Sequence, residues 1–476
     1  MKILMVAMPD AASCWDEVMQ VPNLWLCSIA AHLPEHETKV LDLIIHYRRA
    51  KSVLLRHLEE FRPDVVGISA MTYQFESAKT AAELVKKFDP RIVTVLGGYH
   101  ATMLYDEIMD GPGGGLFDCI VRGEGEETFP ELMNVLGKKA DGLARIAGLS
   151  FRDNGRAVHN PARTNLDLSR VKLPDRSARL YRHFSFFGLP FDTAETSRGC
   201  TMSCRFCSIT GMYGSSFRAF PVARVIDDLR EIRRSGARGV FFVDDNITLN
   251  VPRLRKICGA IVEAGLDYLE YVVQASVAGI VQDPALAAEM GRANFRLVFL
   301  GIENALEKNQ RALDIENKVS AETTLRAIGL LRDAGITVFG GLITGNPDDT
   351  ERDVIDTFRY GRSVGADWIG VQALTPYPKT RIRSELIGQG LVTNLDDYAR
   401  YNGLIANVKT KFLSTRRLNW LLLKEGSKIY FNPFYLLKSR FFRYRRVSPW
   451  PLIMNNFKFI ASGLRGTIFL SRHRWR

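Results

Sequence analysis

The sequence has no long hydrophobic run, which argues against a protein built on membrane-spanning helices. Its 476 residues contain no stretch of about 18 or more uncharged apolar residues. The apolar N-terminal stretch, residues 1–9, ends at a proline and lacks the longer apolar core and small-residue cleavage site of a signal peptide. It is more typical of a buried first strand. We therefore expect a cytoplasmic protein.

A disulfide framework is also missing. The chain has seven cysteines, an odd number. Four are widely spread, at positions 14, 27, 119 and 258, whereas Cys200, Cys204 and Cys207 lie within eight residues. In a reducing compartment, such a cluster is more typical of a metal site than of disulfide pairs.

Most of the chain has no excess of positive charge. The formal net charge is +12, but residues 409–476 contain sixteen Lys and Arg and one acid, Glu425, and therefore carry +15. The preceding residues carry −3. A nucleic-acid-binding body would need a basic face of its own, so we consider a nucleic-acid partner unfavoured.

The length predicts two or three domains, because 476 residues are too many for one compact core. In residues 1–140, short apolar runs alternate with helical patterns, which favours a doubly wound, Rossmann-like parallel sheet. The expected strands are residues 3–8, 38–43, 64–70, 92–97 and 118–122, and the expected helices are residues 23–33, 52–61, 77–88 and 126–136.

The rest of the chain divides into three parts. Residues 141–190 are irregular and rich in turn signals, so we predict a linker there. Residues 191–385 return to strand–helix alternation, which predicts a partial or complete β/α barrel. Its expected strands are residues 193–197, 239–244, 271–275, 297–302, 337–343 and 368–374. We expect residues 386–476 to form a basic, aromatic and mainly helical C-terminal segment.

The three clustered cysteines have the spacing C-x3-C-x2-C and follow the first expected barrel strand. A loop with such spacings can wrap three corners of a 4Fe–4S cube. One iron then stays open and can chelate a small molecule through an amine and a carboxylate. A structural zinc site is the alternative, but zinc sites usually have four ligands and no second Cys/His cluster lies nearby.

This region resembles the radical S-adenosylmethionine (SAM) superfamily, whose motif has an aromatic residue before the third cysteine. Phe206 fills that position. The resemblance implies that SAM is bound by residues at the ends of successive barrel strands. Phe206 would lie near the adenine, Asp244 and Asp245 near the amine, and Glu303 near the ribose hydroxyls. Gln274, on the third strand, would line the pocket.

The resemblance also implies a mechanism. The reduced cluster passes one electron to the SAM sulfonium, and cleavage gives methionine and a deoxyadenosyl radical that can abstract hydrogen from an unactivated C–H bond. The electron would come from a donor such as flavodoxin or ferredoxin. The cofactors carry the difficult chemistry, while the protein positions the substrate and excludes water and oxygen.

The N-terminal region resembles the cobalamin-binding domain that precedes many radical SAM domains. A serine motif and a double glycine would line the nucleotide tail of the corrin, where small residues allow close approach of the backbone. The residues that carry this resemblance are Ser69, Met71, Gly97, Gly98, His100 and Glu124.

One departure from that family concerns the ligand below the cobalt. The D-x-H-x-x-G motif that supplies a histidine is missing, and residues 22–27 occupy the corresponding stretch. We therefore expect no histidine below the cobalt. His100 accompanies the double glycine, where a capping or pocket role is favoured over cobalt ligation. A degenerate domain that binds no corrin is the alternative.

The C-terminal segment interleaves arginines with aromatic residues, as in residues 440–446. This composition suits an anionic membrane surface, so we expect peripheral contact at the inner membrane face. A helical cap over the barrel and RNA binding are the alternatives.

As a whole, the chain resembles cobalamin-dependent radical SAM methyltransferases and the anaerobic magnesium-protoporphyrin monomethyl ester cyclases. We expect methyl transfer to an unactivated carbon, with an oxidative cyclase or another radical redox reaction as the alternative. A tRNA methylthiotransferase is disfavoured because it needs three further cluster cysteines. A lipid or a tetrapyrrole would fit as the small-molecule substrate.

Overall fold

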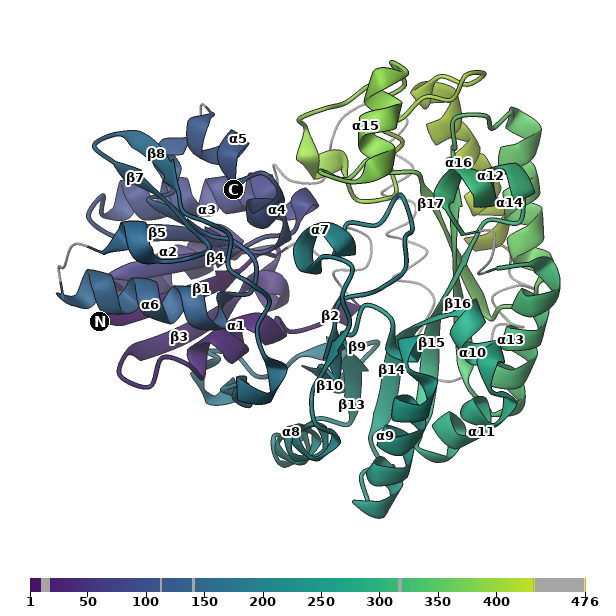
Figure 1. Ribbon diagram of the computed structural model, residues 1–476, viewed down its shortest axis with the longest axis horizontal. Helices are drawn as coiled ribbons and strands as arrows, with labels where there is room; N and C mark the ends of the chain where they lie inside the picture. The colour runs from purple at the N-terminus through teal and green to yellow at the C-terminus, as the bar shows by residue number, and fades with distance from the viewer. Residues whose placement is uncertain are drawn as a thin grey trace. The chain divides into compact units, whose positions relative to one another are not determined.

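The computed structural model describes residues 1–9, 18–111, 114–138, 142–315, 319–430, 432 and 475. The chain divides into two compact units between Phe184 and Ser185, each with helices packed on a sheet (Figure 1). Among the described residues, no helix is long and apolar enough to cross a bilayer. Cys14 and the tail residues 433–474, for which further helix is expected, lie outside the described residues.

The first unit is built on a seven-stranded sheet with the order β3-β1-β4-β5-β6-β7-β8. These strands are β1 (Lys2–Ala7), β3 (Glu37–Asp42), β4 (Val65–Ser69), β5 (Val93–Gly97), β6 (Cys119–Val121), β7 (Leu149–Asp153) and β8 (Arg156–His159). The first five in spatial order are parallel. Since the order extends from β1 in both directions, the predicted doubly wound arrangement is confirmed.

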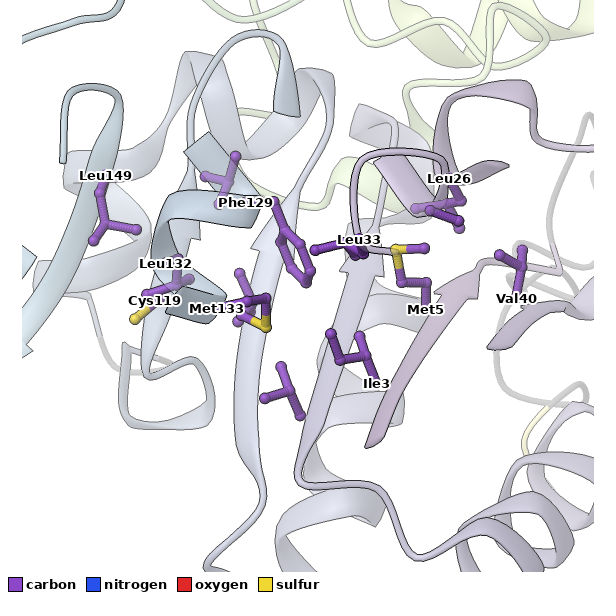
Figure 2. Packing of buried hydrophobic residues seen from close by; sticks show 14 of the residues in the cluster. Ile3, Met5, Leu26, Leu33, Val40, Cys119, Phe129, Leu132, Met133 and Leu149 are labelled. Atoms are coloured by element: carbon purple, nitrogen blue, oxygen red, sulfur yellow. The ribbon is translucent and has the colours of Figure 1, made fainter. Parts of the chain in front are cut away.

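Helices cover both faces of this sheet (Figure 1). They are α1 (Leu24–Ala30), α2 (Ala50–Phe61), α3 (Phe75–Phe88), α4 (Tyr99–Met103), α5 (Tyr105–Asp110) and α6 (Gly125–Lys138), and a short strand, β2 (Met19–Gln20), precedes α1. Helix α1 packs with α6, and α2 packs with α3. Figure 2 shows the core on the α1–α6 side, where Ile3 and Met5 of β1 lie near Leu26 and Phe129. Strands buried on both faces explain the continuous apolar runs of the sequence.

The stretch predicted as a linker contributes two strands to this sheet. Strands β7 and β8 form an antiparallel hairpin, and β7 pairs with β6. At the turn, Asn154 (φ 48°) and Gly155 (φ 82°) both have positive φ, which is the backbone that an Asn-Gly hairpin turn needs. The hairpin satisfies the backbone groups that β6 would otherwise leave unpaired.

The second unit contains six parallel strands in chain order, β10-β13-β14-β15-β16-β17. They are β10 (Leu189–Ala194), β13 (Gly239–Phe242), β14 (Glu270–Ser276), β15 (Phe295–Glu303), β16 (Thr337–Thr344) and β17 (Trp368–Ala373), and β9 (Ser185–Phe186) pairs antiparallel with β10. No pairing joins β17 to β10 within the described residues, so the predicted barrel is a partial one.

The main helices of this unit lie along the outer side of the curved sheet (Figure 1). The helices are α7 (Ile209–Tyr213), α8 (Val222–Arg234), α9 (Val251–Glu263), α10 (Val277–Gln282), α11 (Pro284–Arg292), α12 (Glu307–Leu313), α13 (Ala321–Asp333), α14 (Glu351–Ser363), α15 (Arg381–Gly388) and α16 (Thr415–Tyr430). A two-stranded ribbon, β11 (Ser197–Arg198) with β12 (Arg218–Ala219), interrupts the alternation after β10.

Candidate functional site

The three clustered cysteines lie on one loop, which begins after β11 and ends before β12. The ribbon closes the base of this loop through the pairs Ser197–Ala219 and Arg198–Arg218. Gly199 has a φ of 86°, and a Cβ there would collide with the Ser216 carbonyl group. Only glycine fits at that point, immediately before Cys200. We call residues 199–217 the cysteine loop.

The thiols on this loop are partly enclosed by protein. Burial raises the pKa of Cys207 to about 12, and the neighbouring Cys204 and Cys200 add to the shift. In the described residues, no three His, Cys, Asp or Glu side chains converge on a point as they would around one metal ion. Three cysteines on one short loop are the donor set for a 4Fe–4S cluster with one open iron, whose charge would favour the thiolate forms.

The middle of the cysteine loop rests on a hydrophobic cluster. Cys204 and Phe206 pack against it, and its members are Leu313, Ile315, Ile343, Leu374, Ile382, Leu386, Leu391 and Val408. Backbone hydrogen bonds join Arg205 to the carbonyl of Leu313 and to the amide of Ile382, both at 3.1 Å. The cluster combines Ile343 of β16 with residues of α12, α15 and the chain that follows α15, so Phe206 is held against the second unit at this point.

Asp244 and Asp245, both predicted near the SAM amine, have different surroundings. Asp244 is buried, and its carboxylate accepts hydrogen bonds from the Thr196 amide (2.9 Å), the Thr196 hydroxyl (2.7 Å) and the Ser197 hydroxyl. Asp245 accepts one bond, from the Gly199 amide at 2.9 Å, and burial raises its pKa to about 6. The Asp245 carboxylate can therefore accept further hydrogen bonds from a cationic ligand. The Asp244 carboxylate already accepts three from Thr196 and Ser197.

Gln274 and Glu303 lie toward the carboxyl ends of β14 and β15. Gln274 is exposed, and its amide donates to the Asp244 carbonyl at 3.4 Å. Glu303 has a φ of 61°, which is strained for a residue with a side chain, and the β15–β16 register shifts between Gly301 and Glu303. A Cβ at Gly301 would lie 2.6 Å from the Glu303 carboxylate, so glycine leaves room for this conformation.

The Glu303 carboxylate has no hydrogen-bond donor within the described part of the chain, and burial raises its pKa to about 7. Strained backbone and a partly buried carboxylate without a donor are typical of a ligand contact. The carboxyl ends of β13, β14 and β15 thus bring the predicted SAM residues to one edge of the partial barrel.

The residues predicted to bind cobalamin gather at the carboxyl ends of β4, β5 and β6. Ser69 and Gly97 face each other in the β4–β5 register. A Cβ at Gly98 (φ 94°) would lie 2.7 Å from the Ala70 carbonyl oxygen, whereas a Cβ at Gly97 would meet only the Val121 carbonyl oxygen at 3.8 Å. Space beside Gly97 therefore fits a long ligand tail that runs close to the backbone. Met71 is 38% exposed at the same edge.

His100 and Glu124 are engaged inside the first unit. His100 is buried in α4, with its ring 4.1 Å from that of Phe75. Glu124 follows β6, and its carboxylate accepts a hydrogen bond from the Leu166 amide at 2.8 Å. Both side chains therefore make contacts within the first unit.

Both units of the chain are similar to known protein families. Residues 18–133 match the B12 binding domain, and residues 194–361 match the Radical SAM superfamily. The chain is 30% identical over 448 residues to an uncharacterized methyltransferase of Pyrococcus horikoshii, covering 93% of this chain and 95% of the relative.

More distant similarities extend over most of the chain. An anaerobic magnesium-protoporphyrin IX monomethyl ester cyclase of Cereibacter sphaeroides is 27% identical over 84% of this chain and 63% of the relative. A hopanoid C-3 methylase of Methylococcus capsulatus is 28% identical over 72% of this chain and 64% of the relative. The fold matches that of the cobalamin-dependent SAM radical enzyme OxsB, with a TM-score of 0.72 and 15% identity over 96% of this chain and 72% of that one.

A three-cysteine loop beside the carboxyl edge of a partial β/α barrel defines an iron–sulfur enzyme that acts on SAM. The second unit has this site, and the first has the fold of a corrin-binding domain. The chain belongs to the family of radical SAM enzymes with a B12-binding domain. Its cofactors are a 4Fe–4S cluster, SAM and cobalamin, and enzymes of this class need a reductant and a small-molecule substrate.

Proposed function

We propose that this enzyme methylates a carbon atom of a small molecule. The observation that carries the proposal is the similarity, over almost the whole length of both chains, to a protein named as a methyltransferase. The cluster with SAM would supply a substrate radical, and cobalamin would supply the methyl group. The hopanoid methylase shows that a relative with a named carbon-methylating activity shares most of this chain.

The chain's own residues would bind and orient these groups. Cys200, Cys204 and Cys207 would hold the cluster. Asp245 has acceptor capacity for the SAM amine, and Glu303 has an unsatisfied carboxylate for the ribose hydroxyls. Asp244 would act indirectly, by fixing the chain that enters the cysteine loop, while Gln274 would line the pocket.

In the first unit, Gly97 and Ser69 would line the nucleotide tail of cobalamin, with Gly98 allowing the chain after β5 to pass close to Ala70, which follows β4. Met71 would lie at the rim, because it is exposed at this edge. His100 and Glu124 would support the pocket from behind.

An oxidative cyclase is the second candidate. It is favoured by the similarity to the magnesium-protoporphyrin cyclase, which covers 84% of this chain. The two candidates share the radical step and differ in what the substrate radical does next. A lipid or a tetrapyrrole suits both, and flavodoxin or ferredoxin would be the electron donor.

The products of SAM separate these candidates. With substrate and a strong reductant, a methyltransferase that uses one SAM for the methyl group and one for the radical should form S-adenosylhomocysteine and deoxyadenosine in about equal amounts. Chromatography of an anaerobic reaction with methyl-deuterated SAM measures both, and mass spectrometry detects the labelled product. Deoxyadenosine without S-adenosylhomocysteine, and a product without label, would favour the cyclase.

We also propose a peripheral contact with an anionic membrane, which a surface near the start of α16 supports. Phe412 is 64% exposed and Trp420 is 38% exposed. Two cations lie over the Trp420 ring, the Arg417 guanidinium group at 4.3 Å and the Lys424 amine at 4.6 Å from its centroid. Aromatic side chains beside basic ones are typical of interfacial helices.

Flotation with liposomes tests this contact. The enzyme should float with vesicles that contain phosphatidylserine at low salt and should be released at high salt, because about 1 kcal/mol per basic residue near the surface is screened by ions. Phe412→Ser and Trp420→Ala should weaken binding. The matched control is Leu325→Ser, since Leu325 is an apolar residue of α13 that is 52% exposed. Equal loss with the control, or no flotation of the unaltered enzyme, would contradict a membrane contact through α16.

A further inference from the structure

The cysteine loop leaves the body of the second unit and returns to it at two adjacent points. Thr196 precedes the ribbon strand β11, and Phe220 follows β12. The Phe220 amide donates to the Thr196 carbonyl at 2.9 Å, so the two residues form a neck at the base of the loop. All three cysteines lie beyond this neck.

Arg253, from the first turn of α9, binds both sides of the neck. Its Nη2 atom donates to the Thr196 carbonyl at 2.8 Å and to the Phe220 carbonyl at 2.7 Å. Its Nη1 atom donates to the Thr196 hydroxyl at 2.9 Å. The rigid, planar guanidinium group suits such a fork, which the single ammonium of lysine cannot reproduce.

The neck is held from the side of β13 as well. The Asp244 carboxylate accepts from the amide and the hydroxyl of Thr196, so the Thr196 hydroxyl lies between the carboxylate and Arg253. Asp245 binds the Gly199 amide, one residue before Cys200. The positive charge of Arg253 thus lies close to the Asp244 carboxylate, which offsets part of the cost of enclosing the guanidinium group.

These contacts exceed what closure of the loop needs, because the ribbon and the Phe220–Thr196 bond already close it. The additional contacts of Arg253, Asp244 and Asp245 fix the direction in which the chain leaves the neck toward Cys200. Residues that orient metal ligands change metal affinity by about 10- to 100-fold when they are removed.

We propose that Arg253 is a positioning residue for the iron–sulfur cluster: by holding both carbonyl groups of the neck, it presents the three thiolates in a fixed arrangement. The inference rests on the assignment of the cluster to Cys200, Cys204 and Cys207. It does not depend on whether the enzyme transfers a methyl group.

The test compares the cluster-loaded full-length enzyme with Arg253→Met, Arg253→Lys and Arg255→Met. Arg255 is the matched control, since it lies on the same helix, is exposed, and pairs with Glu289 and Asp283 away from the neck. Anaerobic release of iron to a ferrous chelator is followed, together with the electron paramagnetic resonance spectrum of the reduced cluster and the thermal unfolding midpoint.

We expect iron release from Arg253→Met to be faster by about ten-fold or more, with an altered spectrum of the reduced cluster. Arg253→Lys should lie between this variant and the unaltered enzyme, and Arg255→Met should match the unaltered enzyme. If Arg253→Met does not fold, the iron release and the spectrum of Arg253→Lys test the inference in its place.

Unchanged iron release and spectrum in a folded Arg253 variant would overturn the inference, as would equal acceleration in Arg255→Met. The cysteine variants described below keep the two failures apart. If they retain iron, the cluster assignment itself fails; if they lose iron while the Arg253 variants behave normally, only the role of Arg253 fails.

Discussion

Cys200→Ala, Cys204→Ala and Cys207→Ala should each remove most of the iron and abolish reductive cleavage of SAM. A cluster held by three thiolates loses one corner when any of them is replaced, and the protein offers no substitute ligand on this loop. Iron analysis, the visible absorption of the cluster and the yield of deoxyadenosine measure the result.

Cys258→Ala is the matched control for these variants. Cys258 is buried in α9, and burial raises the pKa of its thiol to about 12, so it is an inert core residue. The control should retain iron and SAM cleavage. Full iron content and activity in any of the three loop variants would show that the cluster is held elsewhere.

Glu303→Gln should weaken SAM binding by about 10- to 100-fold, the factor that corresponds to losing a hydrogen bond to a charged group worth about 1.5–3 kcal/mol. Isothermal titration under anaerobic conditions measures this affinity. Glu307→Gln is the control, because Glu307 is an exposed acid four residues away that pairs with Arg311. Equal affinity in the unaltered enzyme and Glu303→Gln would remove Glu303 from the SAM site.

Glu303→Gln should weaken SAM binding but should stabilise the folded protein without SAM at neutral and higher pH. Burial raises the pKa of Glu303 from 4.5 to about 7, so the folded state holds this proton more tightly than the unfolded chain does. The group therefore favours folding most below pH 4.5, and this contribution is lost as the pH rises through about 7. Above that pH, Glu303→Gln should unfold at a higher temperature than the unaltered protein, and the difference should shrink as the pH falls toward 4.5.

Much of the fold could be predicted because its strands are buried on both faces. Residues 3–8 and 64–70 stand out as apolar runs, and they correspond to β1 (Lys2–Ala7) and β4 (Val65–Ser69). The hairpin of β7 and β8 was missed, although Asn154-Gly155 is a strong turn signal. It occurs in a stretch where prolines suggest irregular chain, and the pairing with β6 depends on residues distant in sequence.

The candidate site shows the same limit. Spacing alone indicated the cysteines, because all three lie on one loop. The sequence could not tell the neighbours Asp244 and Asp245 apart, since what separates them is Thr196, nearly fifty residues earlier in the chain. Arg253 was not singled out, because an arginine in the first turn of a helix has no local pattern that marks its contact with the carbonyls of Thr196 and Phe220.

The hydrophobic support of the cysteine loop has a consequence for the biosynthesis of the enzyme. Cys204 and Phe206 rest on residues as far along the chain as Leu391 and Val408. At a translation rate of about 5–20 residues per second, the loop leaves the ribosome roughly 10–40 seconds before the last part of its support is made. During that interval the apolar base on which Cys204 and Phe206 pack is incomplete. Delivery of iron and sulfide by a maturation system therefore belongs after synthesis of the second unit, when the loop can be seated.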